Sequence, residues 1–219
     1  MDSATYLDRV DIFAGLTESQ LESLRQNSRI RPVLPGTIVV SEGDEPHGLF
    51  VVQSGTLKAF LMDENGREIT LSLLGEGDYF GELALLDEAP RSASVIALER
   101  GELLQLSQQA FLELIDSDPK VMHIVVRNLV ARIRSLTDSV RALALVDVFG
   151  RISRLFSSLA EERDGHLVIE RRLTQQEIAN MVGASREMVN RILRDLVTGG
   201  YIEIEHHRLI LLKKLPQRW

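Results

Sequence analysis

The chain has 219 residues, of which 44% are hydrophobic and 26% are charged, and it contains no cysteine. This composition is typical of a folded globular protein, and the length is sufficient for two compact domains. The lack of cysteine excludes disulfide bonds, thiolate metal sites and cysteine-bound iron–sulfur clusters.

Charge is unevenly distributed along the chain. From Phe149 onward there are 12 Lys and Arg against 9 Asp and Glu, whereas the first 148 residues carry 13 against 23. We therefore expect only the C-terminal part to meet a polyanion. The N-terminus lacks a basic start followed by an apolar run, and no stretch approaches ~18 apolar residues, so we expect a cytoplasmic protein without membrane contact.

The N-terminal half predicts a short helix followed by strands. Thr17-Glu-Ser-Gln20 is a capping box, so an amphipathic helix should begin near residue 17. Short apolar runs separated by glycines then predict an antiparallel sandwich or jelly-roll barrel between Ile30 and Leu106. The predicted strands are residues 37–40, 48–52, 55–61, 69–74, 94–98 and 102–106. The segment Glu64-Asn-Gly-Arg67 is a hairpin turn.

The segment from Gly77 to Val95 interrupts the strands and has the composition of an anion site. Gly81 lacks a Cβ, so its backbone can approach a ligand closely, and Glu82 can accept hydrogen bonds from sugar hydroxyls. A short helical turn begins at Leu83, and its first amides can face an anion. Arg91 supplies a planar fork of donors for phosphate oxygens, and Ser92 adds a hydroxyl.

Asp118-Pro119 opens a long helix, with aspartate as the cap and proline at the first helical position. Apolar residues then alternate in steps of four and three, which predicts a two-stranded coiled coil and a homodimer. The seam residues are Met122, Val126, Leu129, Ile133, Leu136, Val140 and Leu143. The alternative is that this helix packs only on its own barrel.

A second domain follows a boundary that we place near Val146. Asp147 is expected to cap a helix that carries Val148, Ile152, Leu155, Phe156 and Leu159, and Glu161–Gly165 is expected to form a charged turn before a strand at residues 167–169.

A helix-turn-helix is predicted further on. Thr174-Gln-Gln-Glu177 is a capping box, Gly183 makes the turn, and Ser185 caps a helix over residues 186–198 that ends at Gly199-Gly200. The expected buried stripe of the second helix is Val189, Leu193, Leu196 and Val197. Residues 201–204 and 208–211, on either side of His206-His207, predict a two-stranded wing.

Polar residues gather on the opposite face of that second helix. They are Arg186, Glu187, Asn190, Arg191 and Arg194. Residues at the start of such a helix reach base edges in the major groove, where arginine pairs with guanine and glutamate with cytosine. A solvated face with an internal salt bridge is the alternative, and it explains Arg186 and Glu187 poorly because adjacent residues do not face each other on a helix.

Nothing in the sequence forms a catalytic constellation or a metal site. His206 and His207 are neighbours, but adjacent residues on a strand point to opposite faces, and no Gly-x-Ser-x-Gly motif is present. We therefore expect no catalytic activity and no bound metal.

The string Phe80-Gly-Glu-Leu-Ala-Leu followed by Pro90-Arg-Ser-Ala resembles the phosphate-binding cassette of cyclic nucleotide-binding domains. The resemblance implies that Glu82 holds the ribose 2′-hydroxyl, and that Arg91 and Ser92 hold the cyclic phosphate. It also implies backbone contacts from Gly81 and Leu83.

The C-terminal half resembles the catabolite activator protein and fumarate-nitrate regulator family of bacterial transcription regulators, whose recognition helix begins Ser-Arg-Glu, as in Ser185-Arg186-Glu187, with an arginine at the position of Arg191. Asn190 and Met188 depart from the best-known member. The resemblance implies phosphate contacts from Thr174, Gln176 and Ser185, which set register without reading sequence.

The same resemblance covers nearly the whole chain and implies an α+β fold. It consists of a jelly-roll cyclic nucleotide-binding domain (residues 1–117), a dimerisation helix and hinge (residues 118–146) and a winged helix-turn-helix (residues 147–219). The implied function is an effector-responsive regulator that binds double-stranded DNA as a homodimer, with RNA polymerase as a further partner.

The effector is harder to identify. The family's adenine-contacting Thr-Ser pair falls on Leu136 and Thr137, and Arg132 matches an arginine on the phosphate side. Cyclic AMP is our first choice, followed by cyclic GMP and cyclic di-GMP. Ligand-independent action, a nucleotide sensor that acts through a protein partner, and an enzyme are the alternatives.

Overall fold

The computed structural model of the protein describes residues 10–13, 16–163, 165–205 and 208–215. The chain divides into two compact units, of which the first comprises Met1–Leu61 with Leu71–Ile133 and the second Met62–Thr70 with Arg134–Trp219. The domain boundaries predicted at residues 117 and 146 stay a prediction. No helix in the described ranges is both long and apolar enough to span a membrane.

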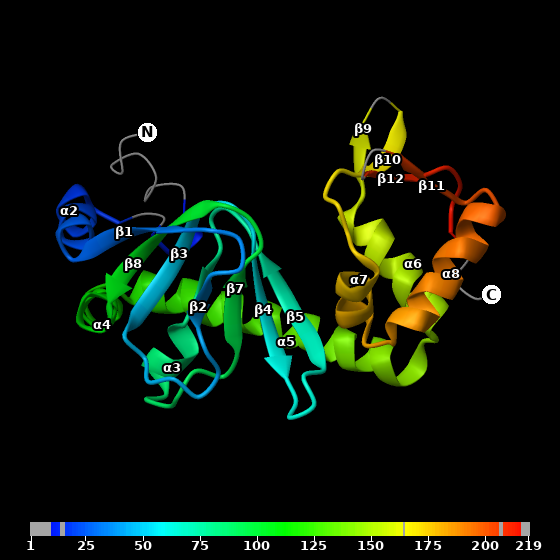
Figure 1. Cartoon of the computed structure of the whole chain (residues 1–219). Helices are drawn as coiled ribbons and strands as arrows, with labels where there is room; N and C mark the ends of the chain where they lie inside the picture. Colours follow the sequence, from blue (N-terminus) through cyan, green and yellow to red (C-terminus); the bar gives the residue numbers. More distant parts are fainter. Residues whose placement is uncertain (1–9, 14–15, 164, 206–207, 216–219) are drawn as a thin grey trace. The chain divides into compact units, whose positions relative to one another are not determined.

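Two antiparallel four-stranded sheets form the β-structure of the N-terminal half (Figure 1). One has the order β1 (Ser28–Val33), β8 (Gly101–Ser107), β3 (Gly48–Ser54), β6 (Tyr79–Phe80). The other has the order β2 (Ile38–Val40), β7 (Ser94–Ala97), β4 (Leu57–Met62), β5 (Glu68–Leu74). Residues of both sheets, including Phe50, Leu57, Val95 and Leu103, form one buried cluster. This arrangement confirms the predicted antiparallel sandwich.

The sheet that contains β3 and β8 is buried on both faces. Phe50 and Val52 pack in the cluster that the two sheets share, whereas Leu49 and Val51 pack in a second cluster with helical residues. That second cluster brings together the short helix η1 (Asp11–Phe13), α2 (Glu18–Gln26), α3 (Glu82–Leu86), α4 (Gln108–Ser117) and α5 (Pro119–Leu145). Because alternate side chains of a strand point to opposite faces, β3 reads as a continuous apolar run.

Four elements of this half were not predicted from the sequence, and the short helix η1 is the first of them. Strand β1 contains Arg29, Arg31 and Pro32, and it lies at the edge of its sheet, where a proline is tolerated. Strand β6 has two residues and pairs only with β3 among the described residues. Helix α4 begins at Ser107, whose side chain accepts from Ala110 N–H, and it buries Phe111 and Leu114.

The predicted caps of α2 and α5 are in place. Thr17 and Gln20 form the expected capping box, and Asp118 lies directly before Pro119 at the start of α5. Helix α5 buries Val121 and Val125 in the helical cluster. Leu129, which the heptad pattern assigned to a dimer seam, packs against this cluster instead.

The second unit contains α6 (Val148–Leu159), α7 (Gln175–Val182) and α8 (Arg186–Thr198) around one apolar core. A four-stranded sheet accompanies them, in the order β11 (Ile202–Glu205), β12 (Arg208–Leu211), β10 (His166–Ile169), β9 (Glu161–Arg163). The predicted wing is therefore two strands of a larger sheet. Its turn, His206-His207, lies outside the described residues.

The predicted helix boundaries of this unit are confirmed by their caps. The side chains of Asp147, Thr174 and Ser185 accept from backbone N–H groups at the starts of α6, α7 and α8. Gly183 has φ of 61°, the left-handed conformation that ends α7 and turns the chain toward α8.

Two details of the second unit differ from the sequence prediction. Val197 was assigned to the buried stripe of α8 but is 46% exposed, and Ile192 takes its place in the core. Glu161–Arg163, expected as part of a turn, pairs with β10 as strand β9. A hairpin can form there because the paired residues satisfy each other's backbone groups regardless of side-chain polarity.

Candidate functional site

The predicted anion segment begins where β6 passes into α3. Gly81 links the two elements with φ of 92°, a conformation that a residue with a Cβ rarely adopts. A Cβ at this position would lie 2.3 Å from Nη1 of Arg91. Glycine is therefore needed for the turn and for the close approach of the arginine.

Arg91 lies inside the first unit, with only 5% of its surface exposed. Its Nη1 donates to the carbonyl of Gly81 and its Nη2 to the carbonyl of Gly48, each at 2.8 Å. The guanidinium carbon is 5.9 Å from the centre of the Phe50 ring. The planar fork thus ties the anion segment to strand β3.

Glu82 is fully buried and forms an ion pair with Arg132 of helix α5. Arg132 also donates to the carbonyl of Tyr79 and lies over the Tyr79 ring, 5.4 Å from its centre. Asn128 donates to the Tyr79 hydroxyl at 3.2 Å. Two residues one turn apart on α5 therefore hold β6 and α3 in place.

Burial disfavours the charged forms of Glu82 and Arg91. It raises the pKa of Glu82, and the cations of Arg132 and Arg91 offset only part of that effect. It lowers the pKa of Arg91, and the carboxylates of Glu82 and Asp44 offset part of that effect in turn. The two residues carry opposite charges in a site from which water is largely excluded, where electrostatic interactions are strong.

Each central residue keeps one buried atom without a hydrogen-bond partner. These atoms are Oε2 of Glu82 and Nε of Arg91. A buried polar atom that lacks a partner costs about 1–3 kcal/mol, so such atoms call for an explanation. The carboxylate oxygen requires a donor, such as a hydroxyl, and the guanidinium nitrogen requires an acceptor, such as a phosphate oxygen.

The other predicted effector residues differ in their setting. Leu83 and Ser92 are exposed, and the side chains of Leu136 and Thr137 are exposed on the part of α5 that belongs to the second unit. Sequence reasoning missed Gly48, Tyr79 and Asn128. The spacing of Asn128 and Arg132 was a usable signal, since residues four apart lie on the same helix face.

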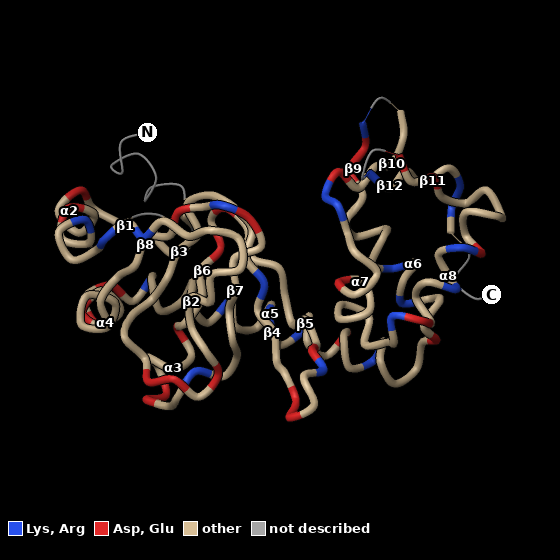
Figure 2. The backbone as a smooth tube through the Cα atoms, viewed as in Figure 1, with Lys and Arg blue, Asp and Glu red and all other residues tan. Residues whose placement is uncertain are grey.

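The predicted reading face lies at the start of α8, where Figure 2 shows basic and acidic segments together. Arg186, Glu187 and Arg191 are exposed there, as are Thr174, Gln176 and Ser185 at the starts of α7 and α8. Asn190 is half-buried and accepts from Gln175 Nε2 at 3.0 Å. Asn190 is therefore partly committed to joining α7 and α8.

Arg151, another residue that sequence reasoning missed, joins the end of α5 to the helix-turn-helix. Its guanidinium donates to the carbonyls of Leu143 at 3.1 Å and Val146 at 3.0 Å, and to that of Gly183 in the α7–α8 turn at 3.3 Å. These bonds occupy carbonyls that the ends of α5 and α7 leave open. They orient the turn relative to the last residues of α5.

Two family models match the chain: a cyclic nucleotide-binding domain over residues 30–118 and a Crp-like helix-turn-helix domain over residues 150–217. The chain is 31% identical over 209 residues to the "CRP-like cAMP-activated global transcriptional regulator" of Mycobacterium tuberculosis, which spans 94% of this chain and 93% of that protein. It is 32% identical to the "Cyclic AMP receptor protein" of Thermus thermophilus over 88% of each chain.

A solved structure has the same fold. It is that of the c-di-GMP-responsive global regulator CLP of Xanthomonas campestris, with a TM-score of 0.78 and 25% identity over 90% of this chain and 100% of that chain.

Proposed function

The chain belongs to the CRP/FNR family of transcription regulators, and from that premise we propose that it is a homodimeric DNA-binding regulator whose effector is cyclic AMP. Such a regulator acts in the cytoplasm, where its DNA is, and RNA polymerase is the expected further partner.

The observation that carries the effector site is the pair of buried atoms without partners, Glu82 Oε2 and Arg91 Nε. A cyclic nucleotide has a ribose 2′-hydroxyl that can donate to the first atom and a phosphate that can accept from the second. No single simple ion supplies both. In this proposal the amides at the start of α3 and the exposed hydroxyl of Ser92 are further donors for the phosphate.

Cyclic AMP is favoured over the other nucleotides by the names of the relatives from Mycobacterium and Thermus. The Xanthomonas protein responds to cyclic di-GMP, which makes that dinucleotide the second candidate. Position 136 is a leucine, which offers an apolar surface instead of a hydroxyl, and Thr137 keeps a hydroxyl for the base.

DNA recognition is assigned to the start of α8. The exposed Arg186, Glu187 and Arg191, with Asn190, are proposed to contact base edges in the major groove. Thr174, Gln176 and Ser185 are proposed to contact phosphates. The positive charge of this part of the chain favours the same polyanion.

The dimer is assigned to an apolar stripe of α5 that the structure leaves exposed. Its members include Met122, Val126, Ile133, Leu136, Val140 and Leu143, each at least 37% exposed. Apolar residues at this spacing form the seam of a two-stranded coiled coil. The stripe is interrupted at Leu129, which packs against the helical cluster of the first unit, and exposed apolar residues on either side of it mark an interaction surface.

Isothermal titration calorimetry tests the effector assignment. We expect saturable binding of cyclic AMP to the purified protein and a weaker signal with cyclic GMP and cyclic di-GMP. The variant Arg91→Lys should bind at least about tenfold more weakly, because lysine lacks the Nε–H group that is proposed to donate to the phosphate. The matched control is Arg31→Lys, because Arg31 lies over the same Phe50 ring at the same 5.9 Å. Failure of both cyclic mononucleotides to bind would refute the assignment.

A further inference from the structure

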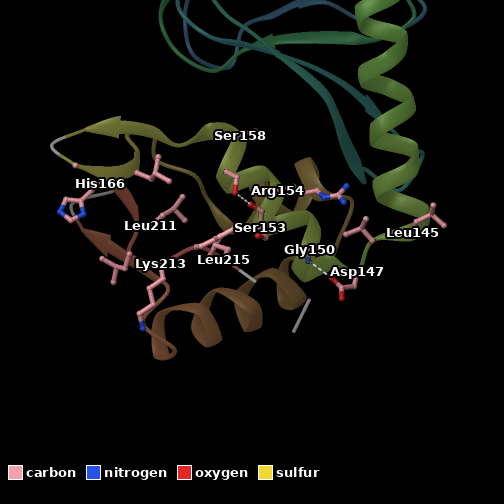
Figure 3. Close-up of a pocket in the computed structure, with 16 residues that line it drawn as sticks. Leu145, Asp147, Gly150, Ser153, Arg154, Ser158, His166, Leu211, Lys213 and Leu215 are labelled. Carbon is pink, nitrogen blue, oxygen red and sulfur yellow. Dashed lines mark hydrogen bonds between the residues drawn. The ribbon is translucent and has the colours of Figure 1, made fainter. Parts of the chain in front are cut away.

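A cavity of about 890 Å³ lies in the second unit, on the side of α6 that faces the end of β12 (Figure 3). One wall is the α6 face that contains Gly150, Ser153, Arg154 and Ser157. The others come from the beginning of β10, the end of β12 with the segment after it, and the junction of α5 and α6. The volume is within the ~300–1,000 Å³ range of small-molecule sites.

Several leucine side chains that line this cavity are exposed to solvent. Leu145 is 77% exposed, Leu167 46% and Leu212 44%, and all three line the wall. Leu211 and Leu215, which are buried, continue the apolar lining. Exposed leucines that line a concavity favour an occupant with an apolar body.

The charged groups of the lining are almost all basic. Arg154 and Lys214 form no hydrogen bond or ion pair with any residue that the structure describes, and Nζ of Lys213 lies 5.7 Å from the centre of the Tyr201 ring. Among the lining residues that the structure describes, the one acidic residue, Asp147, accepts from Gly150 N–H at 2.7 Å as the cap of α6. An unpaired basic rim favours an anionic group.

Serine hydroxyl groups on the α6 wall of the cavity provide hydrogen-bond acceptors. Ser157 donates its hydroxyl proton to the carbonyl of Ser153, and Ser158 donates to the carbonyl of Leu155, each at 2.9 Å. Their protons are used within the helix, so these two hydroxyls can act only as acceptors toward an occupant. The arrangement places polar groups beside an apolar floor.

We propose that this cavity binds a small amphipathic anion, a carboxylate with a short hydrocarbon chain. The chain lies on the leucines, and the carboxylate pairs with Arg154 and the lysines of the segment that follows β12. This site is separate from the effector site around Glu82 and does not depend on the proposed function. It contacts the α5–α6 junction, Leu145–Asp147, so that its occupant reaches the segment joining the long helix to the helix-turn-helix.

The probe is octanoate, titrated into the full chain and followed by amide chemical shifts and by calorimetry. We expect saturable shifts at Gly150, Gly165 and His166, with acetate and octanol each at least about tenfold weaker because each lacks one of the two features. Saturating cyclic AMP should leave octanoate affinity unchanged. The proposal would be overturned if octanoate binding did not saturate, if all three probes bound equally, or if cyclic AMP displaced octanoate.

Two exposed positions allow variants whose folding the amide spectrum itself verifies. Arg154→Gln removes a cation and should weaken octanoate about tenfold, as expected for a hydrogen bond to a charged group. Ser157→Trp should place an indole ring over the α6 wall of the cavity and weaken octanoate binding by at least about tenfold. The control Arg172→Gln removes an exposed cation that does not line the cavity, and binding should be unchanged. Unchanged affinity in both cavity variants would contradict the proposal.

Discussion

Replacement of Arg91 by lysine tests whether the buried guanidinium supports the fold as well as the ligand. Arg91 bridges the carbonyls of Gly81 and Gly48, at 2.8 Å each, and is almost fully buried. A lysine keeps the charge but has no planar fork, so we expect it to retain at most one of the two bonds. One carbonyl then loses a charge-assisted partner, which costs about 1.5–3 kcal/mol.

Hydrogen exchange at the amides of β3 and β8 measures this loss in the unit concerned, because protection there reports the stability of the sheet. A loss of that size lowers protection by about tenfold to a hundredfold. Arg31→Lys is the control, because Arg31 lies equally close to the Phe50 ring but makes only a 3.5 Å bond to Val39. Its effect should stay below about 0.5 kcal/mol. Full protection in Arg91→Lys, or an equal loss in the control, would show that the carbonyl bridge contributes little.

Four further predictions concern single substitutions. Gly81→Ala should lower the free energy of unfolding by at least about 1 kcal/mol, measured in urea, because of its left-handed backbone and the clash with Arg91; an unchanged midpoint would contradict this. In Glu177, burial acts to raise the pKa, but bonds from the N-cap threonine and an ion pair outweigh it and lower the pKa. Glu177→Ala should therefore lower the free energy of unfolding by about 1 kcal/mol at neutral pH. The difference in free energy of unfolding between the two proteins should become smaller as pH falls below 4.5 through the pKa of Glu177 in the folded state. A difference that stays constant with pH would refute the stabilising role of the Glu177 carboxylate. Val140→Glu should produce monomers in sedimentation experiments, since it places a charge in the proposed seam; a persistent dimer would remove that residue from it. Arg186→Ala should cost about 1–3 kcal/mol of specific DNA affinity and relax preference at one base pair, whereas unchanged sequence selection would exclude it as a base reader.

Local signals made the helix ends predictable. Thr17, Asp147, Thr174 and Ser185 each accept from a backbone amide at the start of a helix, as their spacing indicated. A cap depends on residues within one turn, so the sequence contains all of the information. The same is true of Gly183, whose left-handed turn is a property of glycine itself.

Elements that depend on distant partners were harder to predict. Strand β1 exists because Ser28–Val33 pairs with β8, 68 to 78 residues away, and its own arginines and proline gave no apolar pattern. Strand β6 has only two residues, too few for a period to be recognised. Helix α4 is a different case, since Phe111, Leu114 and Ile115 have helical spacing and the signal was available.

Two residues of the candidate effector site could be picked out from the sequence, but their contacts could not. Glu82 and Arg91 were identified from their residue types and spacing, and both are buried in the first unit. The acceptors of Arg91 are backbone carbonyls, one of them from β3, and side-chain pattern carries no information about which carbonyls remain open. The contact of Arg132 with Tyr79 required the three-dimensional placement of α5 against β6.

The affinity of the protein for DNA, measured with and without cyclic AMP, is the most direct test of control by the effector. The DNA used is an operator selected from random sequences. Fluorescence anisotropy at a fixed salt concentration then gives its affinity for the protein with and without cyclic AMP. We predict at least about fivefold tighter DNA binding with saturating cyclic AMP, and an equal gain in cyclic AMP affinity when DNA is bound, because coupling between two binding sites is reciprocal. Equal DNA affinity with and without the nucleotide, in a protein that binds both, would contradict the account.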